Sequence, residues 1–147
     1  KVNIDYLAIA SWGHDVFRNK VRAKGPHQGE LVNKVVYERL KGRVVVIASG
    51  GINSKEKALE ALENADLVGL STPFITDPEF AVKIQEGNES EIQLTIKPEA
   101  LEALAIPKAA FKDIVPLMDF GESLEKEARD FFRGLEANYE GRETDEN

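Results

Sequence analysis

The fold is decided by the stretch Val44-Val45-Val46-Ile47-Ala48-Ser49-Gly50-Gly51-Ile52-Asn53. Its first five residues are apolar at consecutive positions, which is typical of a parallel strand buried on both faces. A glycine pair then ends the apolar run, and Asn53 with Glu56 three residues later has the form of a helix-capping box. The stretch therefore predicts a buried strand that leads through a tight turn into a helix.

Strand and helix patterns alternate around this stretch. Short apolar runs on either side predict two more strands, Ile4–Ala10 and Leu67–Leu70. Apolar residues at helical spacing, and an Asp-Pro pair suited to a helix start, predict three helices. These are Glu30–Lys41, Lys55–Glu63 and a third that begins near Pro78 and ends before Gly87. The order is that of an α/β protein with a parallel sheet.

Crossover handedness limits how such a sheet can be covered. Right-handed crossovers that advance in one direction place every helix on the same face, yet the Val44–Ala48 run demands cover on both. A closed barrel whose other strands precede Lys1 meets that demand. We therefore expect the C-terminal portion of a (βα)8 TIM barrel, about strands six to eight, because such barrels typically have about 250 residues. The alternative is a small three-layer domain whose helices cover both faces.

The expected domain organisation has three parts. Residues 1–87 would form the last three β/α units of the barrel, residues 88–139 a C-terminal elaboration, and residues 140–147 a polar tail. In the elaboration, alternation over Glu91–Ile96 predicts an added edge strand. Its helical patterns are Pro98–Leu104, Lys108–Val115 and an amphipathic Glu122–Tyr139.

Composition excludes several classes of protein. With 42% hydrophobic residues among 147, the chain can build a core, and a net charge of −7 argues against nucleic acid as a partner. No apolar run approaches the ~20 residues that cross a bilayer, and the first residues do not resemble a signal peptide. We therefore expect a cytoplasmic protein without a membrane partner. With no cysteine and two histidines, no metal site is expected.

The turn after the central strand has the residue types of a phosphate site. Gly50 and Gly51 carry no Cβ, so the backbone amides and the following helix N-terminus can approach an anion closely. In barrels, phosphate sites are commonly built from the loops after the seventh and eighth strands. The partner loop would be Ser71-Thr72-Pro73-Phe74. A tight turn without a ligand is the alternative.

Four linked blocks of sequence resemble a known family. They are Ile47-Ala48-Ser49-Gly50-Gly51-Ile52, Ala58-Leu59-Glu60-Ala61-Leu62, Ala65-Asp66-Leu67-Val68-Gly69-Leu70 and Asp77-Pro78-Glu79-Phe80. In this order and spacing they are similar to the C-terminal half of the old yellow enzyme family of FMN-dependent NAD(P)H oxidoreductases. The resemblance covers roughly Ile4–Gly87 and implies an FMN-binding TIM barrel.

The resemblance also implies site residues. Gly50 and Gly51 would bind the FMN phosphate, together with Ser71 and Thr72, which stand where the family usually has Gly-Arg. No catalytic residue is expected in this chain, because the family's substrate-binding and proton-donating residues would lie upstream of Lys1. The whole protein would pass hydride from NADH or NADPH through the flavin to a small-molecule acceptor such as an activated alkene.

Two other functions remain open: a phosphate-binding TIM-barrel enzyme of the aldolase or epimerase type, and a non-catalytic barrel relative that has lost FMN. The expected partner is the remainder of the barrel, N-terminal to this chain. We expect the chain alone to be inactive and to self-associate as a homo-oligomer, because its sheet would be left open.

The loop Ser11–Gly29 stands out by its charge. It holds four basic residues against Asp15, namely Arg18, Lys20, Arg22 and Lys24. They would either steer an anionic nicotinamide or pair with the acidic surface as part of a solvated loop. His14, next to Asp15, would be a loop anchor or a substrate contact rather than a catalytic base.

Overall fold

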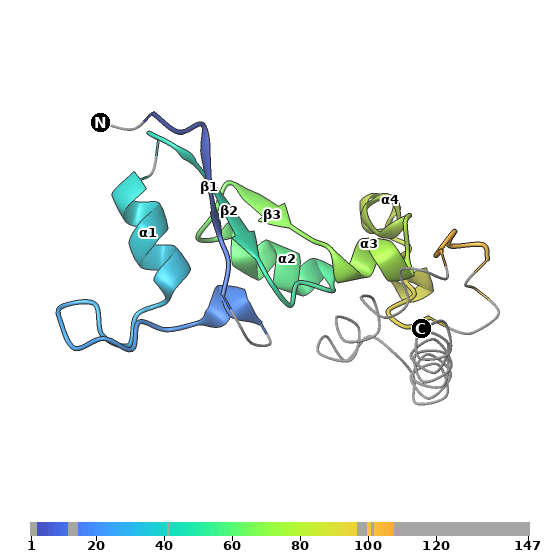
Figure 1. The fold of residues 1–147 in the computed structure, drawn as a ribbon, viewed down its shortest axis with the longest axis horizontal. Coiled ribbons are helices and arrows are strands. Elements are labelled where there is room, and N and C mark those ends of the chain that lie inside the picture. The colour runs from blue at the N-terminus through green and yellow to red at the C-terminus, as the bar shows by residue number, and fades with distance from the viewer. Residues whose placement is uncertain (1–2, 12–14, 41, 97–99, 101, 108–147) are drawn as a thin grey trace, which may run out of the picture. The chain divides into compact units, whose positions relative to one another are not determined.

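The computed structural model describes residues 3–11, 15–40, 42–96, 100 and 102–107 (Figure 1). These residues fall into two units, which divide between Ser71 and Thr72. The boundary expected at residue 87 stays a prediction.

The first unit is built on three parallel strands, as predicted. They are β1 (Tyr6–Ile9), β2 (Val45–Ser49) and β3 (Leu67–Gly69), in the order β1-β2-β3. Ile47 of β2 is in register with Ala8 on one side and Leu67 on the other. All three strands therefore end at the same edge of the sheet, where the loops that follow them meet.

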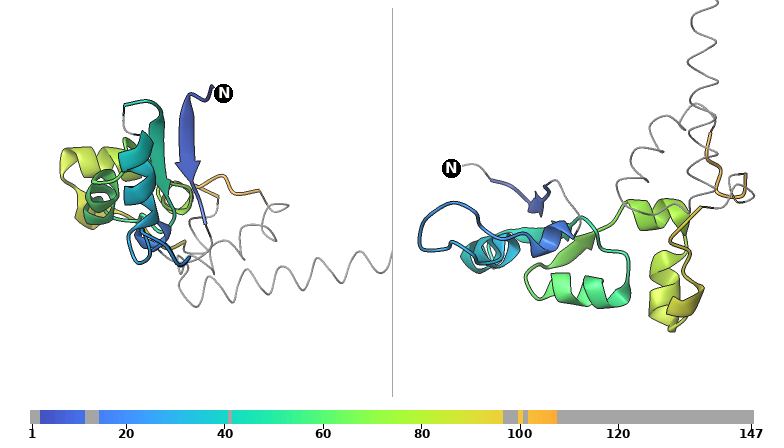
Figure 2. Two further views of the ribbon diagram at one scale, coloured as in Figure 1. Left: turned by 90° about the vertical axis from the view of Figure 1, so that its left-hand side faces the viewer. Right: turned by 90° about the horizontal axis from the view of Figure 1, so that it is seen from below.

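Two helices cover one face of this sheet. They are α1 (Val32–Leu40), which joins β1 to β2, and α2 (Lys55–Leu62), which joins β2 to β3. Figure 2 shows both on the same side of the strands, as right-handed crossovers require. Beneath them lies the core, made of Phe17, Val46, Ala48, Ile52, Ala61 and Ala65.

The opposite face of the sheet has no cover within the described part of the first unit. Along β2, Val46 and Ala48 are fully buried under the helices, while Val45 between β1 and β3 remains 40% exposed. Tyr6 is 62% exposed and Leu67 is 52% exposed on the same side. The apolar run predicts that the central strand is buried on both faces. The described residues of the first unit bury only one of them.

The long loop after β1 is partly anchored. It contains a short 3-10 helix, η1 (Val16–Arg18), whose Val16 and Phe17 are 4% and 3% exposed. Phe17 belongs to the core, so this half of the loop is packed rather than solvated. Further on, Lys20 pairs with Leu31 in an isolated antiparallel bridge.

The second unit differs most from the sequence prediction. Its described elements are α3 (Thr72–Thr76), α4 (Phe80–Glu86) and a 3-10 turn, η2 (Glu89–Glu91). The sequence suggested a loop where α3 lies. The next helix begins at Phe80 rather than Pro78, and it ends as predicted at Gly87, which adopts φ +78°.

The predicted edge strand Glu91–Ile96 is wrong. The Asp77 side chain belongs to a residue that is only 4% exposed. Its carboxylate accepts hydrogen bonds from the backbone amide of Gln93 at 2.9 Å and from that of Glu79 at 3.1 Å. The segment is thus bonded to a carboxylate instead of to a neighbouring strand. The apolar residues of this stretch are not buried alternately, because Leu94 is 38% exposed while Ile96 is 0% exposed.

The remaining predicted helices cannot be compared with described structure. Lys108–Val115 and Glu122–Tyr139 lie outside the described residues, and Pro98–Leu104 is described only in part. In that part, the amide of Leu104 donates to the carbonyl of Ala100 at 2.9 Å.

Candidate functional site

The glycine turn lies directly after β2, at the edge where the strands end. Gly50 and Gly51 adopt φ of +89° and +79°, which residues with a Cβ rarely adopt. Helix α2 follows, and its N-cap is Ser54, whose Oγ accepts the amide of Lys57 at 3.3 Å. The predicted cap at Asn53 is therefore wrong by one residue. The serine hydroxyl satisfies one of the amides that a helix start leaves unpaired.

The space beside the two glycines is filled by the loop after β1. A Cβ at Gly50 would lie 2.6 Å from the Cβ of Val16, and one at Gly51 would lie 2.7 Å from the Cα of Asp15. The amide of Val16 also donates to the carbonyl of Gly50 at 3.0 Å. Glycine is thus required at both positions by the packing of this protein's own loop, through the Val16 side chain at Gly50 and the Asp15 backbone at Gly51. That requirement holds whether or not the turn binds an anion.

A network of four charged side chains holds the loop against α2. Asp15 accepts a hydrogen bond from Lys57 at 2.7 Å and another from Arg18 at 2.6 Å. The Arg18 guanidinium also donates two bonds to Glu60, at 2.8 and 2.5 Å. Lys57 reaches the carbonyl of Gly51 at 3.3 Å as well. The network therefore ties together the loop, the glycine turn and helix α2.

The network changes the titration of its members. The hydrogen bond from Arg18 holds the pKa of Glu60 below its ordinary value, although burial opposes this. The same hydrogen bond raises the pKa of Arg18. Both side chains stay charged at neutral pH, so the pairing persists under physiological conditions.

This pairing bears on the charge anomaly of the loop. Arg18 forms ion pairs with two carboxylates. This agrees with the second interpretation of the basic loop, in which its cations pair with the acidic surface. Arg18 therefore contributes little to the steering of an anionic nicotinamide. Lys20 and Arg22 form no ion pair among the described residues and line a cavity instead.

The predicted partner loop begins two residues after β3. Ser71 is exposed and belongs to the first unit, so it leaves the sheet at the same edge as Gly50. Thr72 is half-buried and is the first residue of α3 in the second unit. Within the described part of the first unit, no hydrogen bond joins the Ser71 hydroxyl to the glycine turn. His14 lies outside the described residues.

Sequence reasoning missed the network, which is the most developed arrangement at this edge. Lys57 and Glu60 stand three residues apart, so the helical pattern of α2 places them on one face. The pairing of that face with Asp15 could not be predicted, because the two segments are 42 residues apart in the chain. Among the described residues no group of three acidic or histidine side chains could hold a metal ion.

A row of parallel strands, with a glycine turn and a capped helix after the central strand, defines an α/β protein. No family model matches the chain. It is 60% identical over 136 residues to an uncharacterized oxidoreductase of Streptococcus pyogenes serotype M5 (strain Manfredo), which covers 92% of this chain and 34% of that protein.

A second relative has a more specific name. The probable NADH-dependent flavin oxidoreductase YqiG of Bacillus subtilis (strain 168) is 32% identical over 113 residues, which are 76% of this chain and 29% of that protein. A shorter match, 35% identical over 56% of the chain, is to a 4-hydroxy-tetrahydrodipicolinate synthase of Stutzerimonas stutzeri (strain A1501), of which it covers 26%.

These relatives confirm the resemblance that the sequence indicated. Over 92% of its length the chain is similar to an oxidoreductase, and over 76% to a probable NADH-dependent flavin oxidoreductase, as the resemblance to the old yellow enzyme family implies. It spans about one third of the length of the curated relatives it matches.

Among the described residues, no helix is both long enough and apolar enough to cross a bilayer.

Proposed function

We propose that these residues are the last three β/α units of an FMN-dependent oxidoreductase that takes hydride from NADH or NADPH. The observation that carries the proposal is 60% identity to an oxidoreductase over 92% of the chain, together with the flavin oxidoreductase relative. Because the chain spans a third of these proteins, the proposal concerns the protein that the complete gene encodes.

The uncovered face of the sheet supports a barrel. Tyr6, Val45 and Leu67 are exposed apolar side chains on one side of a parallel sheet whose other side is covered by helices. In a closed barrel this side faces the interior, where branched and aromatic side chains fill the space. Strands contributed by the rest of the protein would bury these residues. The proposed strands are the sixth to the eighth.

The residues at the strand ends suit the phosphate of FMN in their chemistry. Backbone amides of Gly50 and Gly51, and the hydroxyls of Ser71 and Thr72, are donors of the kind that phosphate oxygens accept. The N-terminus of α2 adds the positive end of its dipole. In place of a guanidinium the loop offers only hydroxyls, so we expect weaker charge compensation than in relatives with Gly-Arg.

In this proposal the chain positions the cofactor and does not perform the chemistry. When bound, FMN would supply the capacity to accept and donate hydride. The glycine turn and Ser71 would fix its phosphate, while the Asp15 network would hold the loop that lies on the turn. Residues that contact the acceptor would lie elsewhere in the protein, and the acceptor would be a small molecule such as an activated alkene.

The absorbance spectrum of the purified complete gene product tests this function. A flavin spectrum that bleaches on anaerobic addition of NADH or NADPH is the expected result. Protein that is folded, carries no flavin and does not bind added FMN would contradict the proposal.

The match to a synthase favours one alternative, a flavin-free phosphate-binding barrel enzyme that uses the same glycine turn. This match covers 56% of the chain, against 92% and 76% for the two oxidoreductases, so the flavin-dependent function is the better supported. Phosphate binding by the glycine turn without FMN binding would select the alternative.

A further inference from the structure

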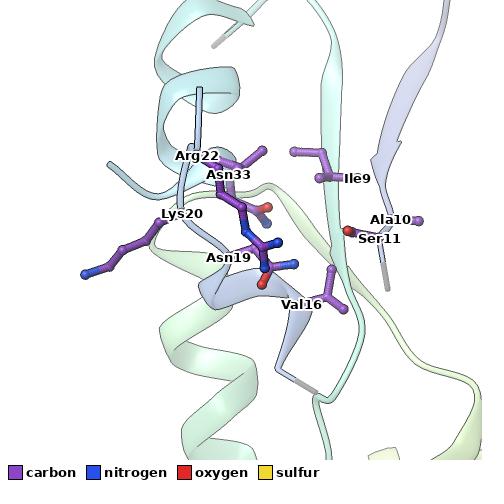
Figure 3. Close-up of a pocket in the computed structure, with 9 residues that line it drawn as sticks. Ile9, Ala10, Ser11, Val16, Asn19, Lys20, Arg22 and Asn33 are labelled. Carbon is purple, nitrogen blue, oxygen red and sulfur yellow. The ribbon is translucent and has the colours of Figure 1, made fainter. Parts of the chain in front are cut away.

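On the helix-covered side of the first unit, a cavity of about 440 Å³ lies at the end of β1. The loop with η1 and the first turn of α1 complete its walls (Figure 3). This volume is in the range of small-molecule sites, which is roughly 300–1,000 Å³. The residues that line the cavity include Ile9, Val16, Lys20, Arg22, Val32 and Asn33.

Asn33 is the anomaly of this cavity. It lies in the first turn of α1 and is 2% exposed, yet neither its Nδ2 nor its Oδ1 has a hydrogen-bond partner among the described residues. Buried amides are nearly always paired, because leaving them unpaired costs free energy. A buried asparagine without a partner among the described residues indicates a place where a bound group can supply one.

Arg22 brings a positive charge to the same place. In Figure 3 its guanidinium turns toward the amides of Asn33 and Asn19, whereas the ammonium of Lys20 points away. The backbone of Val21, the residue before Arg22, is held in place because its amide donates a hydrogen bond to the carbonyl of Glu30 at 2.8 Å. Unlike Arg18, Arg22 forms no ion pair with a described carboxylate. Its fork of donors is therefore available to an anion.

The rest of the lining limits the charge of that anion. Ile9, Val16 and Val32 give the cavity apolar walls, and Arg22 is the one cation that Figure 3 shows turned toward its asparagines. Such walls penalise a doubly charged phosphate more than a singly charged carboxylate, because burial of charge costs free energy unless it is compensated. One guanidinium compensates one carboxylate.

We propose that this cavity binds a small organic carboxylic acid that also carries an amide or hydroxyl group. Its carboxylate pairs with Arg22, its amide or hydroxyl bonds to Asn33, and its carbon skeleton contacts Ile9 and Val16. Both polar atoms of Asn33 are covered by protein, so a neighbouring side chain has to move as the ligand enters, and the exposed Arg22, which Figure 3 shows turned toward Asn33, would be that side chain. The proposal is independent of FMN binding.

N-acetylglycine, which has one carboxylate and one amide, is the probe for calorimetric titration of the complete gene product. N-acetylglycinamide, which lacks the carboxylate, is the matched control ligand and should not bind measurably. Arg22→Gln should weaken binding of the probe by about tenfold to a hundredfold, the range for a lost hydrogen bond to a charged group. Lys24→Gln is the control variant, because Lys24 lies exposed in the same loop and does not line the cavity. It should leave binding unchanged.

Asn33→Leu separates a binding role from a structural one. Leucine has a similar size without polar atoms, so the variant should keep or raise its unfolding temperature while it loses affinity for N-acetylglycine. In protein labelled with ¹⁵N-asparagine, the side-chain signal that disappears in this variant belongs to Asn33. That signal should shift during titration of the unmodified protein, which places the probe in this cavity rather than at the glycine turn.

Three results would overturn the proposal. They are equal binding of the two ligands, equal loss of affinity in Lys24→Gln and Arg22→Gln, and an Asn33 signal that does not move at saturation. Absence of any binding of N-acetylglycine would overturn it as well. If Asn33→Leu does not fold, the surface variant Arg22→Gln and the two ligands still decide the outcome.

Discussion

Gly50→Ala should destabilise the protein through one contact, the approach of Val16 to the glycine turn. The added Cβ would lie 2.6 Å from the Cβ of Val16 and 2.7 Å from its Cγ2. Carbon atoms in good contact are about 3.5–4.0 Å apart, so the overlap is about 1 Å. The amide of Val16 is bonded to the carbonyl of Gly50 at 3.0 Å, which prevents the loop from backing away without losing that bond.

The chain offers a matched control at Gly42. This glycine has φ +76°, and a Cβ added to it would meet nothing within 4 Å. Gly42→Ala thus measures the cost of the left-handed conformation alone, about 1–2 kcal/mol. Gly50→Ala, at φ +89°, should add an overpacking cost of about 1–3 kcal/mol. Its total, about 2–5 kcal/mol, is a large part of a typical stability of about 5–15 kcal/mol.

Urea unfolding of the complete gene product and the two variants, followed by circular dichroism, measures the difference. Gly50→Ala should have the lower midpoint at an unchanged slope. Equal midpoints for the two variants would refute the close approach of the loop to the turn. The outcome also decides how the cofactor site can be tested, because loss of FMN in a Gly50 variant would follow from the clash with Val16 as readily as from a lost phosphate site.

Three further predictions follow from the structure. Ser71→Val leaves the packing of the turn untouched, so it should weaken FMN retention, measured by equilibrium dialysis, with little change in unfolding temperature; unchanged retention would exclude Ser71 from the phosphate site. Burial opposes the charge on Asp77, but bonds from Lys83 and two backbone amides outweigh it and hold the pKa of Asp77 below its ordinary value. The ionised form is thus favoured by folding, and its contribution should be present above about pH 4 and be lost as the pH falls through the lowered pKa. Acid unfolding of Asp77→Asn should therefore be flatter in this range than that of the unmodified protein, and parallel curves would contradict the pairing. Finally, the 147-residue chain alone should self-associate in sedimentation and bind no FMN, and Val45→Lys on its open face should reduce the association.

The strands were predictable because their signal is local. The runs that became β1, β2 and β3 are apolar at consecutive positions, and each lies within a residue or two of its predicted ends. Helices α1 and α2 follow equally from spacing. What the pattern could not give is the cover of each face. Consecutive apolar residues report that both faces will be buried, without saying which segment buries them.

The wrong sequence predictions for the second unit have a common cause, which is hydrogen bonding by a side chain. Asp77 was expected to cap a helix at Pro78, but it bonds to the amides of Glu79 and Gln93 instead. The first bond moves the start of α4 to Phe80, and the second holds the chain of the predicted edge strand in another conformation. Neither bond is visible in hydrophobic periodicity, because periodicity does not report a carboxylate that accepts a bond from a residue 16 positions further along the chain.

The glycine pair was the strongest local signal for the phosphate site. The structure offers a second explanation for why glycine stands at these two positions. The Cβ positions of both glycines point into Val16 and Asp15, so the pair is explained by packing alone. A glycine turn in such a contact cannot by itself distinguish a cofactor site from a structural turn. The distinction has to come from groups that the packing does not explain.

Two groups at this end of the sheet meet that criterion. Ser71 is exposed beside the strand ends and is not one of the core residues, and Asn33 is buried with both polar atoms unpaired in the part of the chain that the structure describes. By contrast, Asp15, Arg18, Lys57 and Glu60 satisfy one another, and their charges are used in joining the loop to α2. A ligand gains most where the protein has left donors and acceptors unmatched, because the cost of desolvating them has already been met in folding. The unmatched amide of Asn33 and the unpaired guanidinium of Arg22 are therefore better indicators of a binding site in this chain than its most conspicuous cluster of charge.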